Sequence, residues 1–104
     1  MAQYDVYSNT DPESLEIIPY LLDVQHDLHQ SLASRTIVPL VRTEIFGQTM
    51  EKLCPPLSVL GETVFMSTPE LAGYPVRDLG PKIATMAGER AVIISAIDFL
   101  LTGF

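Results

Sequence analysis

Residues 55–67 of the 104-residue sequence read PPLSVLGETVFMS, and this segment carries the clearest signal of the fold class. Two short apolar runs, residues 57–60 and 63–66, flank the dipeptide Gly61-Glu62. Glycine at the first central position suits a two-residue type II′ turn, which joins neighbouring antiparallel strands. The stretch therefore predicts a β-hairpin.

Further strand patterns lie on both sides of this hairpin. Residues 3–7 (QYDVY) alternate, with Tyr4 and Val6 on one face. Residues 8–14 (SNTDPES) are rich in Asn, Asp and Pro, which favour turns. Pro39 cannot donate a ladder hydrogen bond, so we expect a strand edge or a bulge there. The other candidate strands are residues 20–25 (YLLDVQ), 35–41 (RTIVPLV) and 70–76 (ELAGYPV).

The last quarter of the chain has helical character. We expect Gly80-Pro81 to open a helix, since proline suits the first helical position, and Gly88 to break or redirect it. From Glu89 onward, apolar residues repeat at helical spacing: Val92, Ile93, Ala96, Ile97, Leu100 and Leu101. The predicted fold class is a mostly antiparallel β domain closed by one C-terminal helix.

Composition narrows the possible functions. Hydrophobic residues make up 47% of the chain and charged residues 18%, which predicts one packed domain over residues 1–104 rather than a disordered chain. With 13 acidic and 6 basic side chains, the formal net charge is −7. Such a surface repels phosphate backbones, so we expect no unaided nucleic-acid binding and favour a basic protein partner.

Cysteine usage and apolar runs indicate the compartment. Cys54 is the only cysteine, which excludes an intramolecular disulfide and a zinc site built on several thiolates. The N-terminus lacks the basic head and apolar run of a secretory signal. The longest apolar stretch, residues 91–101, is shorter than the roughly 20 residues that span a bilayer. We therefore expect a cytoplasmic protein with no membrane partner.

The sharpest polar cluster is DVQHDLH (residues 23–29). On a helical turn, His26 and His29 would share a face, with Asp23 or Asp27 near enough to add a carboxylate ligand. No fourth ligand accompanies them in the sequence, and the favoured interpretation is a solvated loop that leaves a strand. We expect no metal and no cofactor.

Signals for covalent catalysis are weak. Cys54 precedes Pro55-Pro56 and has no basic neighbour in sequence that would lower its pKa, so we predict a small, buried or half-buried side chain. The sequence contains neither a G-x-S-x-G elbow nor a phosphate-binding glycine loop. The arginines are scattered: Arg35, Arg42, Arg77 and Arg90. These observations favour an interaction module over an enzyme, and no catalytic residue is predicted.

The apolar C-terminus, AIDFLLTGF (residues 96–104), allows two interpretations. In the first, Leu100 and Leu101 belong to the core and the last three residues fray. In the second, Gly103 is a thin, flexible joint that lets backbone approach a partner closely, and Phe104 is an aromatic anchor of the kind that dominates binding hot spots.

Several motifs taken together resemble the CcdB family, the toxins of CcdA–CcdB toxin–antitoxin systems. They are YDVYSN (residues 4–9), LLDVQHDL (21–28), RTIVPL (35–40), LGETVFM (60–66) followed by PELAGYPV (69–76), and the closing AIDFLLTGF. The resemblance covers nearly the whole chain. It implies an SH3-like antiparallel β barrel with a C-terminal helix, assembled as a homodimer.

The resemblance also implies a function that is not enzymatic. CcdB toxins bind the A subunit of DNA gyrase and trap the complex of that enzyme with cleaved DNA. A CcdA-like antitoxin would remove the toxin from gyrase. The toxin–antitoxin complex would repress its own operon, so contact with operator DNA is expected only through the antitoxin complex.

Gyrase-binding residues are carried over from the family by position: Leu28, His29, Asp98, Leu101, Thr102, Gly103 and Phe104. The family pattern ends in tryptophan, glycine and isoleucine. Here Thr102 stands at the tryptophan position and the chain contains no tryptophan. Either Leu101 and Phe104 supply the apolar area instead, or this protein binds antitoxin while poisoning gyrase weakly.

Two other functions stay open beside gyrase poisoning. The MazF and Kid endoribonucleases share the barrel that the resemblance implies, but the acidic charge and the lack of an evident basic groove disfavour RNA binding. The other is a relative that only binds antitoxin, which the threonine at position 102 would permit.

Overall fold

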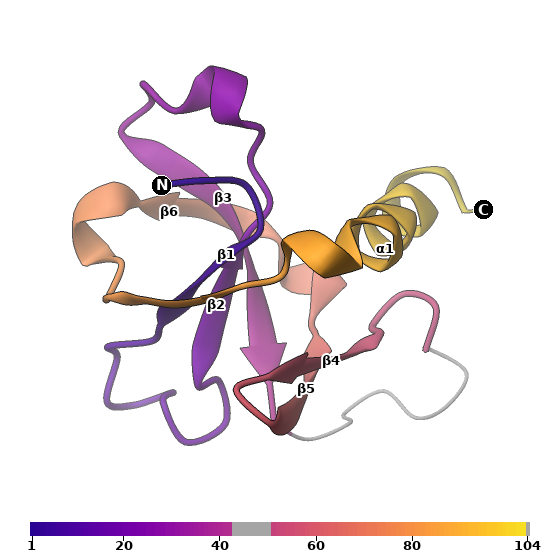
Figure 1. Ribbon diagram of the computed structural model, residues 1–104, viewed down its shortest axis with the longest axis horizontal. Coiled ribbons are helices and arrows are strands. Elements are labelled where there is room, and N and C mark those ends of the chain that lie inside the picture. The colour runs from indigo at the N-terminus through magenta and orange to yellow at the C-terminus, as the bar shows by residue number, and fades with distance from the viewer. Residues whose placement is uncertain (43–50, 104) are drawn as a thin grey trace.

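Seven strands followed by one α-helix make up the part of the chain that the computed structural model describes, residues 1–42 and 51–103 (Figure 1). The strands are β1 (Asp5–Ser8), β2 (Tyr20–Asp23), β3 (Ser34–Val41), β4 (Pro56–Val59), β5 (Glu62–Met66), β6 (Ala72–Pro75) and β7 (Lys82–Thr85). The helix α1 spans Arg90–Thr102, and short 3-10 helices are η1 (Asp27–His29), η3 (Thr68–Glu70), η4 (Val76–Asp78) and η5 (Ala87–Glu89).

All strand pairs are antiparallel, in the order β4-β5-β3-β2-β1-β7, and β6 pairs with β3 outside this path. β6 pairs with one side of the β3-β2-β1 group and β7 with the other, and residues 76–81 connect them. The strands therefore curl into a half-barrel. The predicted fold class, a mostly antiparallel sheet consistent with an SH3-like barrel and closed by a C-terminal helix, is confirmed.

Pro39 lies in β3, the longest strand, at a point where the strand changes partner. On one side β3 pairs with β2. On the other side, residues 34–37 pair with β6 and residues 40–41 pair with β5. Pro39 falls between these two segments, and its carbonyl accepts a hydrogen bond from the Ser67 N–H at 2.9 Å. The local interruption that proline requires is thus a change of partner rather than an edge or a bulge.

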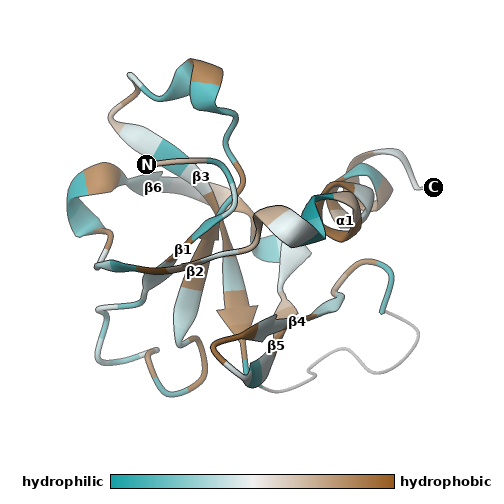
Figure 2. Cartoon of the chain, in the orientation of Figure 1, coloured by the Kyte–Doolittle hydropathy of each residue, from teal (hydrophilic) through white to brown (hydrophobic). Residues whose placement is uncertain are grey.

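The hydrophobic core lies between α1 and one face of the β1-β2-β3 group. Val6, Leu22 and Val38 point into it from the three strands, and Ile93 and Ala96 reach it from the helix. The β4–β5 hairpin closes its third side. Much of the brown, hydrophobic colour in Figure 2 lies on the central strands and α1, while teal predominates in the loop between β2 and β3.

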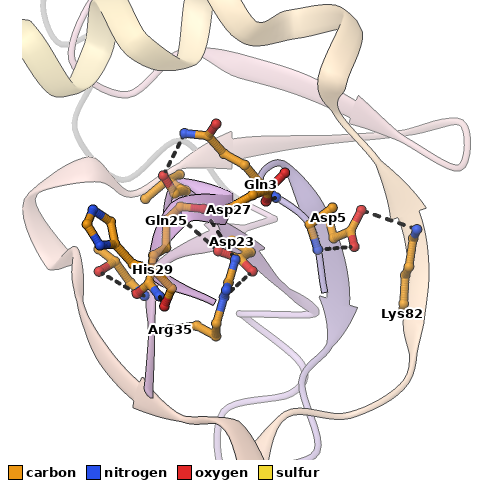
Figure 3. Close-up of polar contacts among 11 residues, drawn as sticks. Gln3, Asp5, Asp23, Gln25, Asp27, His29, Arg35 and Lys82 are labelled. Atoms are coloured by element: carbon orange, nitrogen blue, oxygen red, sulfur yellow. Dashed lines mark hydrogen bonds and ion pairs between the residues drawn. The ribbon is translucent and has the colours of Figure 1, made fainter. Parts of the chain in front are cut away.

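The opposite face of the same strands is also buried, but it is partly charged. Side chains alternate along a strand, so the neighbours of the core residues point to this second face. It carries Tyr7, Leu21 and the charged residues Asp5, Asp23 and Arg35, all buried. Figure 3 looks into the half-barrel and shows Asp23 and Arg35 inside the ring of strands.

The β4–β5 hairpin is confirmed, but its predicted turn is wrong by one residue. Val59 pairs with Glu62, so the central residues of the turn are Leu60 and Gly61. Their φ angles are 52° and 83°, which is the type I′ pattern rather than type II′. Glu62 lies in β5, where its carboxylate is 2.7 Å from Nε of Arg42.

Gly80-Pro81 does not open a helix, contrary to expectation, but leads into β7. A Cβ at Gly80 would lie 2.5 Å from the carbonyl oxygen of Ser8. The Ser8 N–H in turn donates to the Pro81 carbonyl at 3.0 Å. This close approach directs the chain along β1, and the helix begins only at Arg90, after η5.

Only part of the apolar face of α1 is buried. Ile93 and Ala96 are fully covered and Ile97 is partly covered. The remaining residues predicted for this face are exposed: Val92, Leu100 and Leu101. The interpretation that places the two leucines in the core is therefore wrong. Within the described ranges, no helix combines the length and the apolarity needed to cross a membrane.

Substitution of Leu60 by asparagine should stabilise the protein by about 1 kcal/mol, because a left-handed backbone disfavours leucine while Asn-Gly suits a type I′ turn. Urea unfolding at fixed protein concentration measures the gain. Leu60→Ala removes the same exposed side chain but keeps the unfavourable φ, and it should gain little. Equal stability of the two variants would contradict the backbone explanation.

Candidate protein-binding surface

Two exposed leucines mark the predicted partner-binding segments. Leu28 in η1 is 78% exposed and Leu101 near the end of α1 is 74% exposed, the two highest values among large hydrophobic side chains in the described part of the chain. His29 and Asp98, predicted beside them, are also exposed. In Figure 1 the loop between β2 and β3 and the C-terminal end of α1 lie apart. The surface therefore has two separate parts.

The end of α1 has a defined geometry. Gly103 adopts a left-handed conformation (φ 79°, ψ 15°), and its N–H donates to the Phe99 carbonyl at 2.9 Å. This is a helix cap that favours glycine, so Gly103 ends the helix in a fixed direction instead of acting as a flexible joint. The Thr102 hydroxyl donates to the Asp98 carbonyl at 2.7 Å. Phe104, the predicted aromatic anchor, lies outside the described residues.

The segment around η1 is held mainly by polar contacts. Nδ1 of His26 accepts from the Leu28 N–H at 3.0 Å, which caps the short helix. Oδ1 of Asp27 accepts from the Gln3 N–H at 2.7 Å, which ties the segment to the N-terminus. No residue of η1 is buried. Leu28 is therefore exposed on a short helical turn that hydrogen bonds, rather than apolar contacts, hold in place.

The metal-binding interpretation of residues 23–29 gains no geometric support. The Asp23 side chain is fully buried and paired with Arg35, whereas His26 and His29 are exposed. Nδ1 of His26 is occupied by a backbone N–H. Across residues 1–42 and 51–103, no three His, Cys, Asp or Glu side chains gather closely enough to hold an ion.

A buried ion pair lies beneath this segment. Oδ2 of Asp23 is 2.7 Å from Nε of Arg35, and both side chains are fully buried (Figure 3). Burial raises the pKa of Asp23, while hydrogen bonds from Arg35 and from the Gln25 N–H (3.0 Å) oppose the rise. Nη2 of Arg35 donates to the Gln25 carbonyl at 3.2 Å. The pair thus fixes the backbone where β2 ends and the exposed loop begins.

The arrangement suits a macromolecular partner better than a small molecule or a covalent reaction. Cys54 is buried, as predicted, and burial raises the pKa of its thiol, which disfavours the nucleophilic thiolate. A cavity of about 170 Å³ lies elsewhere, among Ile18, Leu21, Ile37 and Tyr74, and none of the predicted binding residues lines it. The exposed leucines instead offer apolar area on an open surface.

Sequence reasoning missed two residues that support this surface. From the sequence, Arg35 is described only as one of several scattered arginines, and Gln25 only as the last residue of a candidate strand. The detectable signal is their position: each lies in or beside an apolar strand pattern, where a polar side chain is buried only if it has hydrogen-bond partners.

Comparison with known families matches the model described as CcdB protein to residues 3–103. Comparison with curated proteins finds no match. The matched range includes the half-barrel, the helix and every predicted binding residue except Phe104.

Removing one member of the buried pair should destabilise the protein strongly. Arg35→Met leaves the Asp23 carboxylate buried without its counter-charge, and we expect a loss of about 3–5 kcal/mol in urea unfolding. The double variant Asp23→Leu/Arg35→Met leaves no isolated charge and should be more stable than Arg35→Met alone. Additive losses in the double variant would show that the charges do not act as a pair.

Proposed function

The chain belongs to the CcdB family, and on that premise we propose that it is the toxin of a type II toxin–antitoxin system that poisons DNA gyrase. It binds the A subunit and traps gyrase on cleaved DNA. The observation that carries the proposal is the exposure of Leu28 and Leu101 at positions where the family contacts gyrase. Single exposed leucines are common on protein surfaces, so the proposal rests on their coincidence with the positions carried over from the family.

Leu101 supplies the main apolar contact at the helix end. Burying a leucine side chain contributes about 1.5–3 kcal/mol. This contribution partly compensates for the tryptophan of the family pattern, whose position is occupied here by Thr102. The hydroxyl of Thr102 is already bonded to the helix backbone. Gly103 fixes the direction in which the chain leaves the helix, and Phe104 adds aromatic area. Leu28, His29 and Asp98 complete the gyrase-binding set.

The protein acts by binding alone and makes or breaks no bond. Gyrase performs the cleavage, and the toxin stabilises the cleaved state by binding it in preference to the resealed one. A homodimer would present two copies of the surface around one axis to a two-fold symmetric enzyme. A CcdA-like antitoxin neutralises the toxin, and DNA is contacted only through that complex. Because gyrase is the target, the site of action is the cytoplasm.

A gyrase cleavage assay with purified protein tests the proposal. The wild-type chain should trap cleaved DNA, and a form without Thr102, Gly103 and Phe104 should not. Leu101→Ala should weaken trapping roughly tenfold or more, since about 1.4 kcal/mol of lost burial corresponds to tenfold in affinity. Leu60→Ala, at an exposed leucine on the β4–β5 turn, is the matched control and should trap normally.

Two outcomes would contradict the proposal. If the wild-type chain neither binds the A subunit nor traps cleaved DNA, the protein is not a gyrase poison, and binding to antitoxin alone becomes the better explanation. If the purified chain cleaves RNA in the absence of gyrase, the endoribonuclease alternative replaces it.

A further inference from the structure

Gln25 joins the interior of the half-barrel to the exposed segment that carries Leu28. Its side chain is almost fully buried, at 9% exposure. Oε1 accepts from the Thr36 N–H at 3.0 Å, and Nε2 donates to the His29 carbonyl at 2.8 Å. Because a backbone N–H only donates and a carbonyl only accepts, these two partners fix the orientation of the amide.

The backbone of Gln25 is held as firmly as its side chain. Its N–H donates to Asp23 and its carbonyl accepts from Arg35, the two members of the buried ion pair. Figure 3 shows these contacts side by side, with the amide of Gln25 directed towards His29. Every polar group of Gln25 therefore has a partner, and the residue links the ion pair to the loop.

The loop has few other attachments. All side chains of residues 26–32 are exposed, so apolar packing does not hold them. In the described part of the chain, two hydrogen bonds join these residues to the rest of the protein: Gln25 Nε2 to the His29 carbonyl, and the Gln3 N–H to Asp27. The Leu32 N–H also donates to the His29 carbonyl, at 3.2 Å. The carbonyl of His29 is thus one of the two points at which hydrogen bonds attach the loop, and it also accepts from within the loop.

We propose that Gln25 is a positioning residue for the partner-binding surface, which holds η1 so that Leu28 and His29 are presented in their bound geometry. The inference rests on the proposed function for the identity of the partner, although the anchoring itself does not. A loop ordered in advance loses less conformational entropy on binding, so anchoring it raises affinity without any contact between Gln25 and the partner.

Hydrogen exchange on the free protein tests the anchoring. Gln25→Met keeps the length of the side chain but removes both amide contacts. The amides of Leu28, His29, Gln30 and Leu32 donate hydrogen bonds within the loop and serve as the probes. We expect them to exchange roughly fivefold to tenfold faster in Gln25→Met, as for the loss of one net hydrogen bond. Unchanged exchange at these amides would overturn the inference.

Asn9→Leu is the matched control, because it removes a buried amide that braces a different loop. Nδ2 of Asn9 donates to Ser14 and to the Ile18 carbonyl, and its Oδ1 accepts from the Asp11 N–H. Its loss should speed exchange between residues 9 and 18 and leave the probe amides unaffected. Faster exchange of the probe amides in this control would mean that they report general destabilisation, and the inference would fail.

A double-mutant cycle with Leu28→Ala then tests the effect on binding to the gyrase A subunit. In the wild-type background Leu28→Ala should weaken binding roughly tenfold. In the Gln25→Met background the same change should cost clearly less, because Leu28 is no longer held in place. An equal cost in both backgrounds would overturn the positioning role. If the wild-type chain does not bind gyrase, the proposed function fails, while the exchange experiment still decides whether Gln25 anchors the loop.

Discussion

The buried pair of Asp23 and Arg35 is the contact on which the second face of the half-barrel depends. Two full charges with no exposed surface are tolerated only when they are close and when further hydrogen bonds satisfy them. The pair meets this condition in part: the Gln25 N–H donates to Asp23 and the Gln25 carbonyl accepts from Nη2 of Arg35, whereas Nη1 of Arg35 has no hydrogen-bond partner among the described residues. The same contacts that satisfy the charges therefore define where β2 ends and how the following loop leaves the barrel.

This arrangement couples the interior to the surface. The apolar face of the sheet packs against α1 and positions Leu101, while the polar face positions Leu28 through Gln25. Apolar packing is non-directional, whereas a hydrogen-bonded network specifies one geometry. The helix end carries its own directional element in the left-handed cap at Gly103. Each part of the proposed gyrase-binding surface is thus oriented by a local feature: the Gln25 hydrogen bonds orient the loop that carries Leu28, and the Gly103 cap orients the end of the helix.

The threonine at position 102 changes how the helix end works. A tryptophan there would contribute stacking area, whereas Thr102 bonds back to the Asp98 carbonyl and supports the last turn of the helix. In the proposed complex, Leu101, which the fold leaves exposed, supplies apolar contact at the helix end.

Sequence patterns correctly predicted the elements that local chemistry specifies: the alternating strands, the turn after β1, the hairpin, most of the final helix and the burial of Cys54. Through the resemblance to a family, the sequence also predicts Leu28 and Leu101 as binding residues, and the structure shows that both side chains are exposed. Gly80-Pro81 leads into a strand for a reason that local sequence does not contain, because a tertiary contact with Ser8 overrides the helical preference of proline. The hairpin turn likewise lies at Leu60-Gly61, because Val59 pairs with Glu62 across the hairpin. The roles of Asp23, Gln25 and Arg35 depend on partners in other strands or beyond the next loop. The spacing of residues along the sequence does not show which of them become neighbours in the folded protein.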